Sequence, residues 1–362
     1  MMALAGTVVG ALCPAASARA LRICRVDNET QGTEFFSDDG QALTDAIAGA
    51  MPGDQLNVTG TCTGIYSLDK DLSLTGVSGK TSPIATLDAK GAGTTLSVNP
   101  GVVATLTNLV ITGGSARGGG GIFNNGTLTL NSSVVSGNSA TALGGGIENE
   151  FATLTLNSST VTRNKAGSGG GIANVFAGVV LNSSTVSRNQ AEERGGGIRN
   201  DRSGLTLNSS TVSRNEAGQL GGGIENELGS VTMNASSVRR NTTNGDGGGI
   251  ANDYGGSITL SFSTVTRNAA SGNGGGMYNN DSDEHISNIT MDSSTVSRNS
   301  ADGNGAGIYN HFGKVTLDLS TVYRNRAAGD GGGIYNLLGT VTLESSNVSR
   351  NIPDNCVHVP GC

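Results

Sequence analysis

The sequence predicts an all-β protein built as a parallel β-helix, a solenoid of about 12 coils with a short N-terminal capping helix. The first observation is nine copies of one pattern, close to GGGI-x-N-x-x-G-x-[LV]-T-L-N-S-S-T-V-S-R-N, between Gly119 and Asn351. The second is that Leu-Thr-Leu and Thr-Val-Ser segments alternate with period two, whereas Gly triplets and Asn-Ser-Ser turns interrupt any helical periodicity. The third is composition, because 58 Gly, no Trp and 4% aromatic residues cannot fill a conventional globular core.

Two other repeat architectures fit these observations less well. Leucine-rich repeats share the period of about 25 residues, but their spaced leucines are missing, and propeller blades need about 40 residues per unit. A parallel β-helix, in which each copy forms one coil, is the remaining architecture. Successive coils of such a solenoid lie about 4.8 Å apart, so equivalent side chains stack along the axis.

Three columns hold one residue type in all nine copies, which predicts that each residue stacks on its own kind. Stacked Asn amides can hydrogen-bond from coil to coil, and stacked Val can fill a narrow core. The columns are Asn124, Asn149, Asn174, Asn200, Asn226, Asn252, Asn279, Asn310 and Asn336; Val135, Val161, Val186, Val212, Val238, Val265, Val296, Val322 and Val348; and Asn138, Asn164, Asn189, Asn215, Asn241, Asn268, Asn299, Asn325 and Asn351.

Four segments follow one another along the chain. Residues 1–20 resemble a secretory signal, with an apolar stretch before an Ala18-Arg19-Ala20 cleavage site. Residues 21–115 are expected to form an N-terminal cap and irregular first coils, 116–351 the nine-coil β-helix, and 352–362 a C-terminal cap. In the N-terminal segment Leu43, Ile47 and Met51 recur at helical spacing before Pro52, which predicts a short amphipathic helix that covers the first coil.

Four cysteines remain after the signal segment, two near each end of the predicted rod. Of the three pairings that four cysteines allow, Cys24 with Cys62 and Cys356 with Cys362 is expected, because a solenoid keeps its termini far apart. Such disulfides imply an oxidising compartment. A zinc site is the competing interpretation, but neither end carries two closely spaced pairs of ligands.

The repeat resembles a known family at two tetrapeptides. Gly144-Gly145-Gly146-Ile147 and Val161-Thr162-Arg163-Asn164, with their equivalents, are similar to the GGA[ILV] and FxxN motifs of the polymorphic outer-membrane protein repeats, within the pectin-lyase-like superfamily. The resemblance covers about two thirds of the chain. It implies a right-handed β-helix that is secreted or displayed on a bacterial surface, often as an adhesin; the wider superfamily includes polysaccharide lyases and hydrolases.

Carboxylates replace the repeated turn asparagine in the last three coils, at Asp292, Asp318 and Glu344. Stacked about 5 Å apart, they could act as acid and base on a glycan or hold Ca²⁺. A second acidic run, Asp281, Asp283 and Glu284, offers further oxygen ligands for Ca²⁺ in the longest coil, although a solvated turn or loop is the preferred interpretation of either group. No other cofactor is expected.

Two further columns favour binding over catalysis. Arginine occupies one position in eight coils, including Arg298 and Arg324, where an anionic polymer or interleaved acidic residues would relieve the repulsion. Tyr278, Tyr309 and Tyr335 share another position and could stack against sugar rings or simply pack on one another. In the earlier coils that position holds Phe123, Glu148, Ala173, Arg199, Glu225 and Ala251.

The expected function is therefore that of an exported, noncatalytic β-helix that binds a glycan or a partner along its face. A net charge of −7 and sparse aromatic residues disfavour nucleic acid, and no transmembrane segment is expected in the mature chain. The main alternative is a polysaccharide lyase or glycoside hydrolase that uses Asp292, Asp318 and Glu344. A minor alternative is an ice-binding solenoid, because the Thr-Val-[Ser/Thr] segments would present rows of hydroxyl groups.

Overall fold

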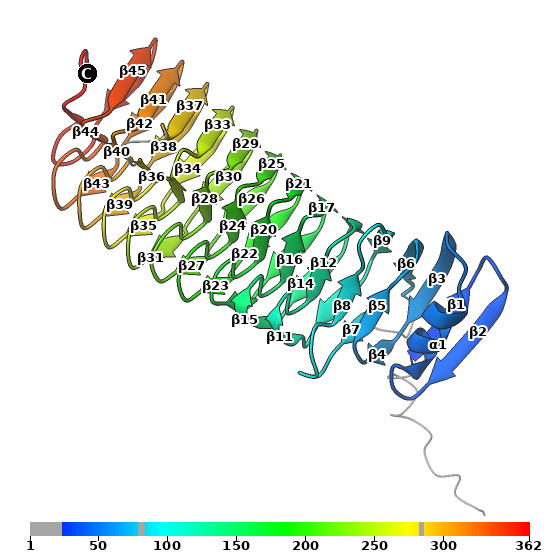
Figure 1. Ribbon diagram of the computed structural model, residues 1–362. Helices are drawn as coiled ribbons and strands as arrows, with labels where there is room; N and C mark the ends of the chain where they lie inside the picture. Colours follow the sequence, from blue (N-terminus) through cyan, green and yellow to red (C-terminus); the bar gives the residue numbers. More distant parts are fainter. Residues whose placement is uncertain (1–23, 79–83, 282–285) are drawn as a thin grey trace, which may run out of the picture.

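Each repeat supplies short strands to parallel sheets that run the length of the molecule (Figure 1). The computed structural model describes residues 24–78, 84–281 and 286–362, and these form a β-solenoid of about 11 turns. The described strands form four sheets, named A to D. Within one repeat the chain passes through sheets A, B, D and C in that order. The predicted fold class, a parallel β-solenoid with a single short helix, is confirmed.

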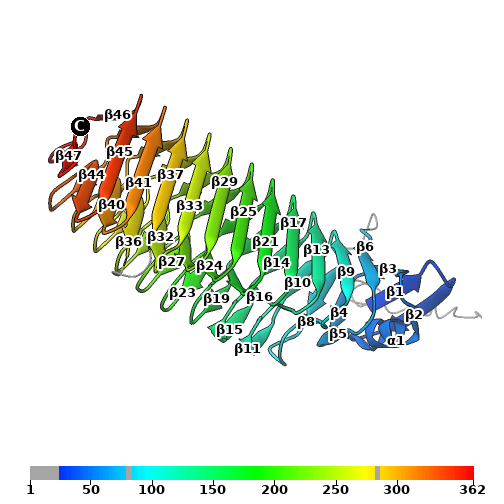
Figure 2. The same ribbon diagram turned by 45° about the horizontal axis from the view of Figure 1, so that its top comes forward.

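Sheet A contains the Leu-Thr-Leu segments, which lie side by side in Figure 2. Its parallel strands are β3 (Asp54–Thr59), β6 (Leu72–Gly76), β9 (Val103–Thr107), β13 (Thr127–Asn131), β17 (Thr153–Asn157), β21 (Gly178–Asn182), β25 (Gly204–Asn208), β29 (Ser230–Asn234), β33 (Ser257–Ser261), β37 (Asn288–Asp292), β41 (Lys314–Asp318) and β45 (Thr340–Glu344).

Sheet B contains the Thr-Val-Ser segments. Its strands are β4 (Thr61–Thr63), β7 (Thr86–Asp88), β10 (Val110–Thr112), β14 (Val134–Ser136), β18 (Thr160–Thr162), β22 (Thr185–Ser187), β26 (Thr211–Ser213), β30 (Ser237–Arg239), β34 (Thr264–Thr266), β38 (Thr295–Ser297), β42 (Thr321–Tyr323) and β46 (Asn347–Ser349).

In most repeats the strand of sheet C directly follows a Gly triplet. Its strands are β5 (Tyr66–Leu68), β8 (Leu96–Val98), β12 (Ile122–Asn124), β16 (Ile147–Glu150), β20 (Ile172–Val175), β24 (Ile198–Asp201), β28 (Ile224–Glu227), β32 (Ile250–Asp253), β36 (Met277–Asn280), β40 (Ile308–His311), β44 (Ile334–Leu337) and β47 (Cys356–Val357).

Sheet D has the shortest strands and lies between sheets B and C along the chain. Its strands are β11 (Ser115–Gly118), β15 (Ser139–Leu143), β19 (Lys165–Ala166), β23 (Gln190–Ala191), β27 (Glu216–Ala217), β31 (Thr242–Thr243), β35 (Ala269–Ala270), β39 (Ser300–Ala301) and β43 (Arg326–Ala327).

The core is a narrow channel of aliphatic side chains, one layer per coil. Leu128, Leu130 and Val135 are fully buried, and each pairs in register with the equivalent residue of the next coil. Alternate residues of each strand face inward, as the period-two pattern predicted. The cross-section is filled by Leu, Ile and Val, which explains how a chain without Trp buries a continuous core.

Both invariant asparagine columns are buried and hydrogen-bonded along the axis. The side-chain amide of Asn124 donates to Oδ1 of Asn149 at 2.7 Å. In the second column Oδ1 of Asn164 accepts from both the backbone N–H of Asn138 and its side-chain amide, at 3.0 and 3.1 Å. Both columns also donate to backbone carbonyls, such as those of Thr153 and Ile111, and so satisfy buried polar groups of the main chain.

The N-terminal end is closed by helix α1 (Gln41–Gly49) and by an antiparallel hairpin, β1 (Cys24–Asn28) and β2 (Thr33–Ser37), added to sheet A beside β3. Leu43 and Ile47 are buried as predicted, but Met51 is 64% exposed. The prediction was wrong for Met51 because the helix ends at Gly49, before Met51 could turn inward. The hairpin was not predicted.

The disulfides pair as the sequence predicted. Cys24 of β1 bonds to Cys62 of β4, and Cys356 of β47 bonds to Cys362. Each bond therefore joins two segments at one end of the rod. No helix among the described residues is long and apolar enough to cross a membrane.

Candidate functional site

An exposed column of arginines follows the corner between sheets B and D, and we call it the arginine ridge. It consists of Arg163, Arg188, Arg214, Arg240, Arg267, Arg298, Arg324 and Arg350. All eight residues adopt left-handed backbone conformations, with φ between 55 and 58°, and Gly137 holds the same corner in the first repeat. A left-handed conformation is costly for most residues with a Cβ, whereas Gly lacks one and Asn tolerates the conformation, so Gly or Asn would suit this corner better than Arg.

No carboxylate among the described residues lies within 4.0 Å of a ridge guanidinium group. Among the described residues, direct ion pairs with interleaved acidic residues therefore do not relieve the repulsion along the ridge. The one close partner described is a ring, since the Arg324 guanidinium lies 5.8 Å from the centre of Tyr323. On sheet B, half-buried hydroxyl residues form a row three positions before the ridge arginines: Thr160, Thr185, Thr211, Ser237, Thr264, Thr295 and Thr321.

The second row of sheet B hydroxyls is less accessible than the sequence suggested. Thr162 and Ser187 are each 8% exposed and Ser213 is 4% exposed. The flat double row of hydroxyl groups that ice binding would need is therefore not presented in these coils.

The three tyrosines form a continuous stack on sheet C. The Tyr278 and Tyr309 ring centres are 5.4 Å apart, and those of Tyr309 and Tyr335 are 5.5 Å apart, with nearly parallel planes. Burial raises the pKa of Tyr278 and of Tyr309. Both faces of the Tyr309 ring are covered by its neighbours, so a sugar ring could reach only its edge.

Asp292, Asp318 and Glu344 lie in register at the ends of β37, β41 and β45. The same column holds asparagine in the first five repeats and Ser261 in the sixth, and the amide of Asn157 donates to Oδ1 of Asn131 at 2.9 Å. Asp292 accepts a hydrogen bond from the Ser293 hydroxyl at 2.8 Å. The acidic side chains thus continue an amide column at the corner between sheets A and B.

The expected calcium ligands are only partly within the described residues. Asp281 is buried and accepts a hydrogen bond from the backbone N–H of Ser287 at 3.1 Å, whereas Asp283 and Glu284 lie outside the residues that the structure describes. Across residues 24–78, 84–281 and 286–362, no group of three or more His, Cys, Asp or Glu side chains is arranged to hold a metal ion.

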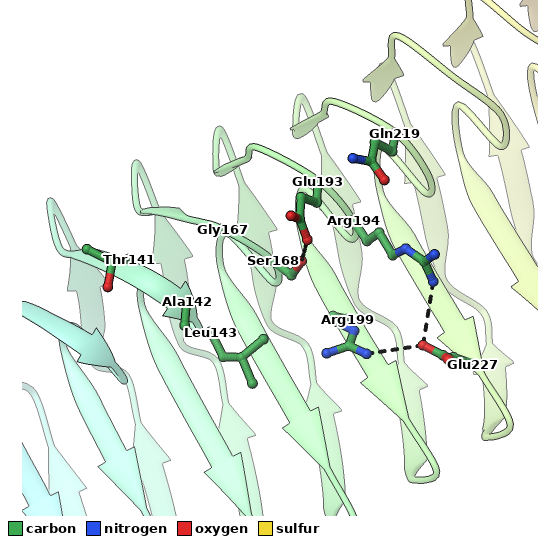
Figure 3. Close-up of a pocket in the computed structure, with 10 residues that line it drawn as sticks. All are labelled: Thr141, Ala142, Leu143, Gly167, Ser168, Glu193, Arg194, Arg199, Gln219 and Glu227. Carbon is green, nitrogen blue, oxygen red and sulfur yellow. Dashed lines mark hydrogen bonds and ion pairs between the residues drawn. The ribbon is translucent and has the colours of Figure 1, made fainter.

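A charged groove runs over the outer face of sheet C, and sequence reasoning did not identify it. Two adjoining cavities, of 520 and 570 Å³, share Ala142 and Leu143 as lining residues. The first is also lined by Arg117, Phe123, Glu148 and Glu150. The second is shown in Figure 3, where Glu193, Arg194, Arg199 and Glu227 project into it from neighbouring coils.

The second cavity is organised around a partly buried ion-pair network, of which only Glu225 is fully buried. Arg199 lies 3.1 Å from Glu227 and 3.5 Å from Glu225, and Arg194 lies 3.6 Å from Glu227. Glu225 is completely buried, and burial raises the pKa of its carboxyl to about 8, against the opposing effect of the Arg199 charge. Neither carboxyl oxygen of Glu225 accepts a hydrogen bond among the described residues.

Glu148 occupies the same column three coils earlier, but without such a partner. It is 7% exposed, and no hydrogen bond or ion pair joins its carboxyl to another described residue. Burial, with a smaller contribution from the Glu150 charge, raises the pKa of Glu148 to about 7. The sequence signal for this groove was present, since Glu148, Arg199 and Glu225 were the charged members of the column that later holds tyrosine.

The buried carboxyl of Glu148 makes a testable prediction for stability. A carboxyl whose folded pKa is raised favours folding below its unfolded pKa, near 4.5, and this advantage is lost as pH rises through about 7. We expect Glu148→Gln to reduce the loss of unfolding free energy between these pH values by about 3 kcal/mol. Urea denaturation at several pH values measures this, with Glu216→Gln at an exposed position as the control. Equal pH dependence in both variants would contradict the prediction.

An apolar stripe at the corner between sheets C and A was also missed. Its members are Phe151, Phe176, Leu228, Tyr254, Phe312 and Leu338. Phe151 is 70% exposed, and its ring stacks on that of Phe176 with centres 5.4 Å apart. The available signal was an apolar residue two positions after the invariant asparagine in six repeats, at a turn where polar residues are usual.

Comparison of the chain with protein-family models, with curated proteins and with solved structures gave no match.

Proposed function

We propose that this protein is an exported, noncatalytic β-solenoid that binds a linear anionic glycan along the arginine ridge. The observation that carries the proposal is the ridge itself, eight exposed guanidinium groups in register with no carboxylate within 4.0 Å among the described residues. The two disulfides support export, because such bonds persist in oxidising compartments. The similarity of the GGGI and V-x-R-N tetrapeptides to surface-protein repeats is further support.

Folding alone gives little reason for arginine at this corner. The position requires a positive φ, which Gly137 adopts in the first repeat without steric cost. Neighbouring guanidinium groups about 4.8 Å apart repel each other by about 1 kcal/mol even in water. A ligand that brings negative charges at regular intervals would remove this repulsion along a line of about 34 Å.

A glycan with carboxylate or sulfate groups fits this surface better than other polyanions. Guanidinium groups form paired hydrogen bonds with planar carboxylates, and the row of hydroxyl residues on sheet B can bond to sugar hydroxyls. Nucleic acid is a weaker candidate, because the net charge is −7 and Tyr323 is the only aromatic residue on the sheet B strands beside the ridge.

Charge removal on the ridge tests the proposal. We expect the Arg298→Ala, Arg324→Ala double variant to bind polygalacturonate or alginate about tenfold more weakly, and to lower the slope of log affinity against log salt by roughly one to two. Retention on immobilised polymer and titration at several salt concentrations measure both quantities. Neutral dextran should not bind to either protein.

A matched control separates the ridge from net charge. Lys314 is exposed at the start of β41, in the same repeat as Arg324 but on sheet A. Lys314→Ala should leave affinity nearly unchanged, whereas Arg324→Ala should weaken it. Equal losses in the two single variants would show that binding follows overall charge and would refute a specific role for the ridge.

The polysaccharide lyase or hydrolase alternative has one supporting observation, the register of Asp292, Asp318 and Glu344. The same polymers can be assayed for new reducing or unsaturated ends with and without Ca²⁺. Ends that disappear in Asp318→Asn, without a change in melting temperature, would replace the noncatalytic proposal by an enzymatic one.

A further inference from the structure

We infer that the cavity lined by Phe123, Glu148 and Glu150 is a binding site for an organic cation, a guanidinium or alkylammonium group that pairs with the Glu148 carboxyl. This site is lined by residues of sheets C and D and contains no residue of the arginine ridge, which follows the corner between sheets B and D. Its ligand has the opposite charge to the glycan proposed for the ridge.

A second buried glutamate, Glu225, shows how the protein itself pairs a carboxyl in this column. Glu225 and Glu148 belong to one column of sheet C, and both are buried. At Glu225 the neighbouring residue one coil earlier is Arg199, whose guanidinium lies 3.5 Å from the carboxyl. A second guanidinium, from Arg194, lies 4.0 Å away. The protein thus supplies cations to the buried carboxyl at this place in the column.

At Glu148 the corresponding neighbours cannot do so. The residue one coil earlier is Phe123 and the residue one coil later is Ala173, so neither can pair with a carboxylate. A cavity of 520 Å³ takes the place of an internal partner. The Phe123 ring adds an electron-rich surface that attracts cations, and Glu150, on the same strand, adds a second negative charge.

The wall of the cavity is shaped to receive the carboxyl. Gly118 of β11 pairs in register with Leu143, and the same wall position in later coils holds Ser168, Arg194 and Leu220. A Cβ built on Gly118 would lie 2.0 Å from Oε2 of Glu148. The missing side chain at Gly118 therefore makes room for this carboxyl, and the neighbouring coils lack that space.

The charged groups that face Glu148 are few. Glu150 on its own strand raises the pKa of Glu148, and Arg117 on β11 lowers it by a smaller amount than burial raises it. A cation binds the ionised form, so apparent affinity follows the ionised fraction. With a pKa of about 7 this fraction, and with it the affinity, falls about tenfold between about pH 8 and pH 6.

Butylguanidinium and butylammonium are suitable probes because they carry the same alkyl chain and a single charge. Titration calorimetry of the full chain, with sodium chloride keeping ionic strength constant, should show saturable one-to-one binding of at least one probe. Glu148→Gln should weaken this binding about tenfold or more, because it removes a charge-assisted hydrogen bond. Acetyl-arginine-amide then shows whether a peptide-borne arginine reaches the site as well as a free cation does.

Three control variants make the test specific. Gly118→Ala keeps every charge but displaces the Glu148 carboxyl, and it should weaken binding severalfold while the fold is retained, because the clash is with the end of a flexible side chain. Arg117→Ala removes a like charge and should strengthen binding. Glu216→Gln removes one negative charge from an exposed position and should have no effect. Binding that persists in Glu148→Gln, that lacks the stated pH dependence, or that neither probe shows would overturn the inference, without bearing on glycan binding by the ridge.

Discussion

Replacing Asn215 by alanine is expected to lower the free energy of unfolding by about 4 kcal/mol, although the change removes only a small polar group. Asn215 is 1% exposed and lies midway along the second asparagine column. Its amide donates to the Val186 carbonyl and to Oδ1 of Asn241, both at 3.1 Å. Its Oδ1 accepts from the backbone and side-chain amides of Asn189, at 2.9 and 3.1 Å. Alanine would leave several of these groups buried without a partner.

The control for Asn215→Ala is the same substitution at Asn234. Asn234 belongs to the turn column at the corner between sheets A and B, is exposed, and makes a side-chain hydrogen bond to Asn208 at 2.9 Å. Because water can replace its partners, Asn234→Ala should cost less than about 1 kcal/mol. Guanidinium denaturation measures both changes. Similar losses at the two positions would show that burial is not what makes the invariant column stabilising.

Removal of the Cys24–Cys62 disulfide is expected to destabilise the N-terminal cap by about 4 kcal/mol, because the bond closes a loop with a sequence separation of 38 that contains α1. Both cysteines are fully buried, and the bond ties β1 to the first strand of sheet B. In Cys24→Ala, Cys62→Ala, the hairpin and α1 should exchange amide hydrogens faster than the central coils. Hydrogen exchange resolved along the chain would detect this difference.

The Cys356–Cys362 disulfide provides the comparison. Its sequence separation is 6, so the same loop-closure argument gives only about 2 kcal/mol. Cys356→Ala, Cys362→Ala should therefore loosen only the last coil. If both double variants lose the same stability, or if exchange accelerates throughout the rod, the disulfides do not act as local closures of the two ends.

The stacked columns were predictable because a repeat of nearly constant length converts sequence position into spatial position. Once each copy forms one coil, Asn124 must lie beside Asn149, and Tyr309 between Tyr278 and Tyr335. The disulfide pairing followed from the same geometry, since the two ends of a solenoid cannot meet. The antiparallel hairpin of β1 and β2 was not predictable in this way, because it lies outside the repeat.

The charged groove required the folded chain. The sequence shows that charged residues fall in the column of Phe123, Glu148 and Ala173, but it does not show that a cavity lies beside them. The burial of Glu148 depends on Gly118, which lies 30 positions earlier in the sequence and belongs to another sheet. Likewise, the lack of carboxylates within 4.0 Å of the arginine ridge, among the described residues, depends on where each acidic side chain points.

The sequence by itself determined the period, the parallel solenoid, the inward Leu, Val and Ile layers, the asparagine columns, the capping helix and the disulfide partners. These features obey rules that act within one repeat or between identical positions of adjacent repeats, about 4.8 Å apart. Only the tertiary structure decided which residues outside the repeated positions are buried, which charges find partners, and where the surface is hollow. Burial and pairing of this kind arise from contacts between different columns and different sheets, and the spacing of residues along one chain does not specify them.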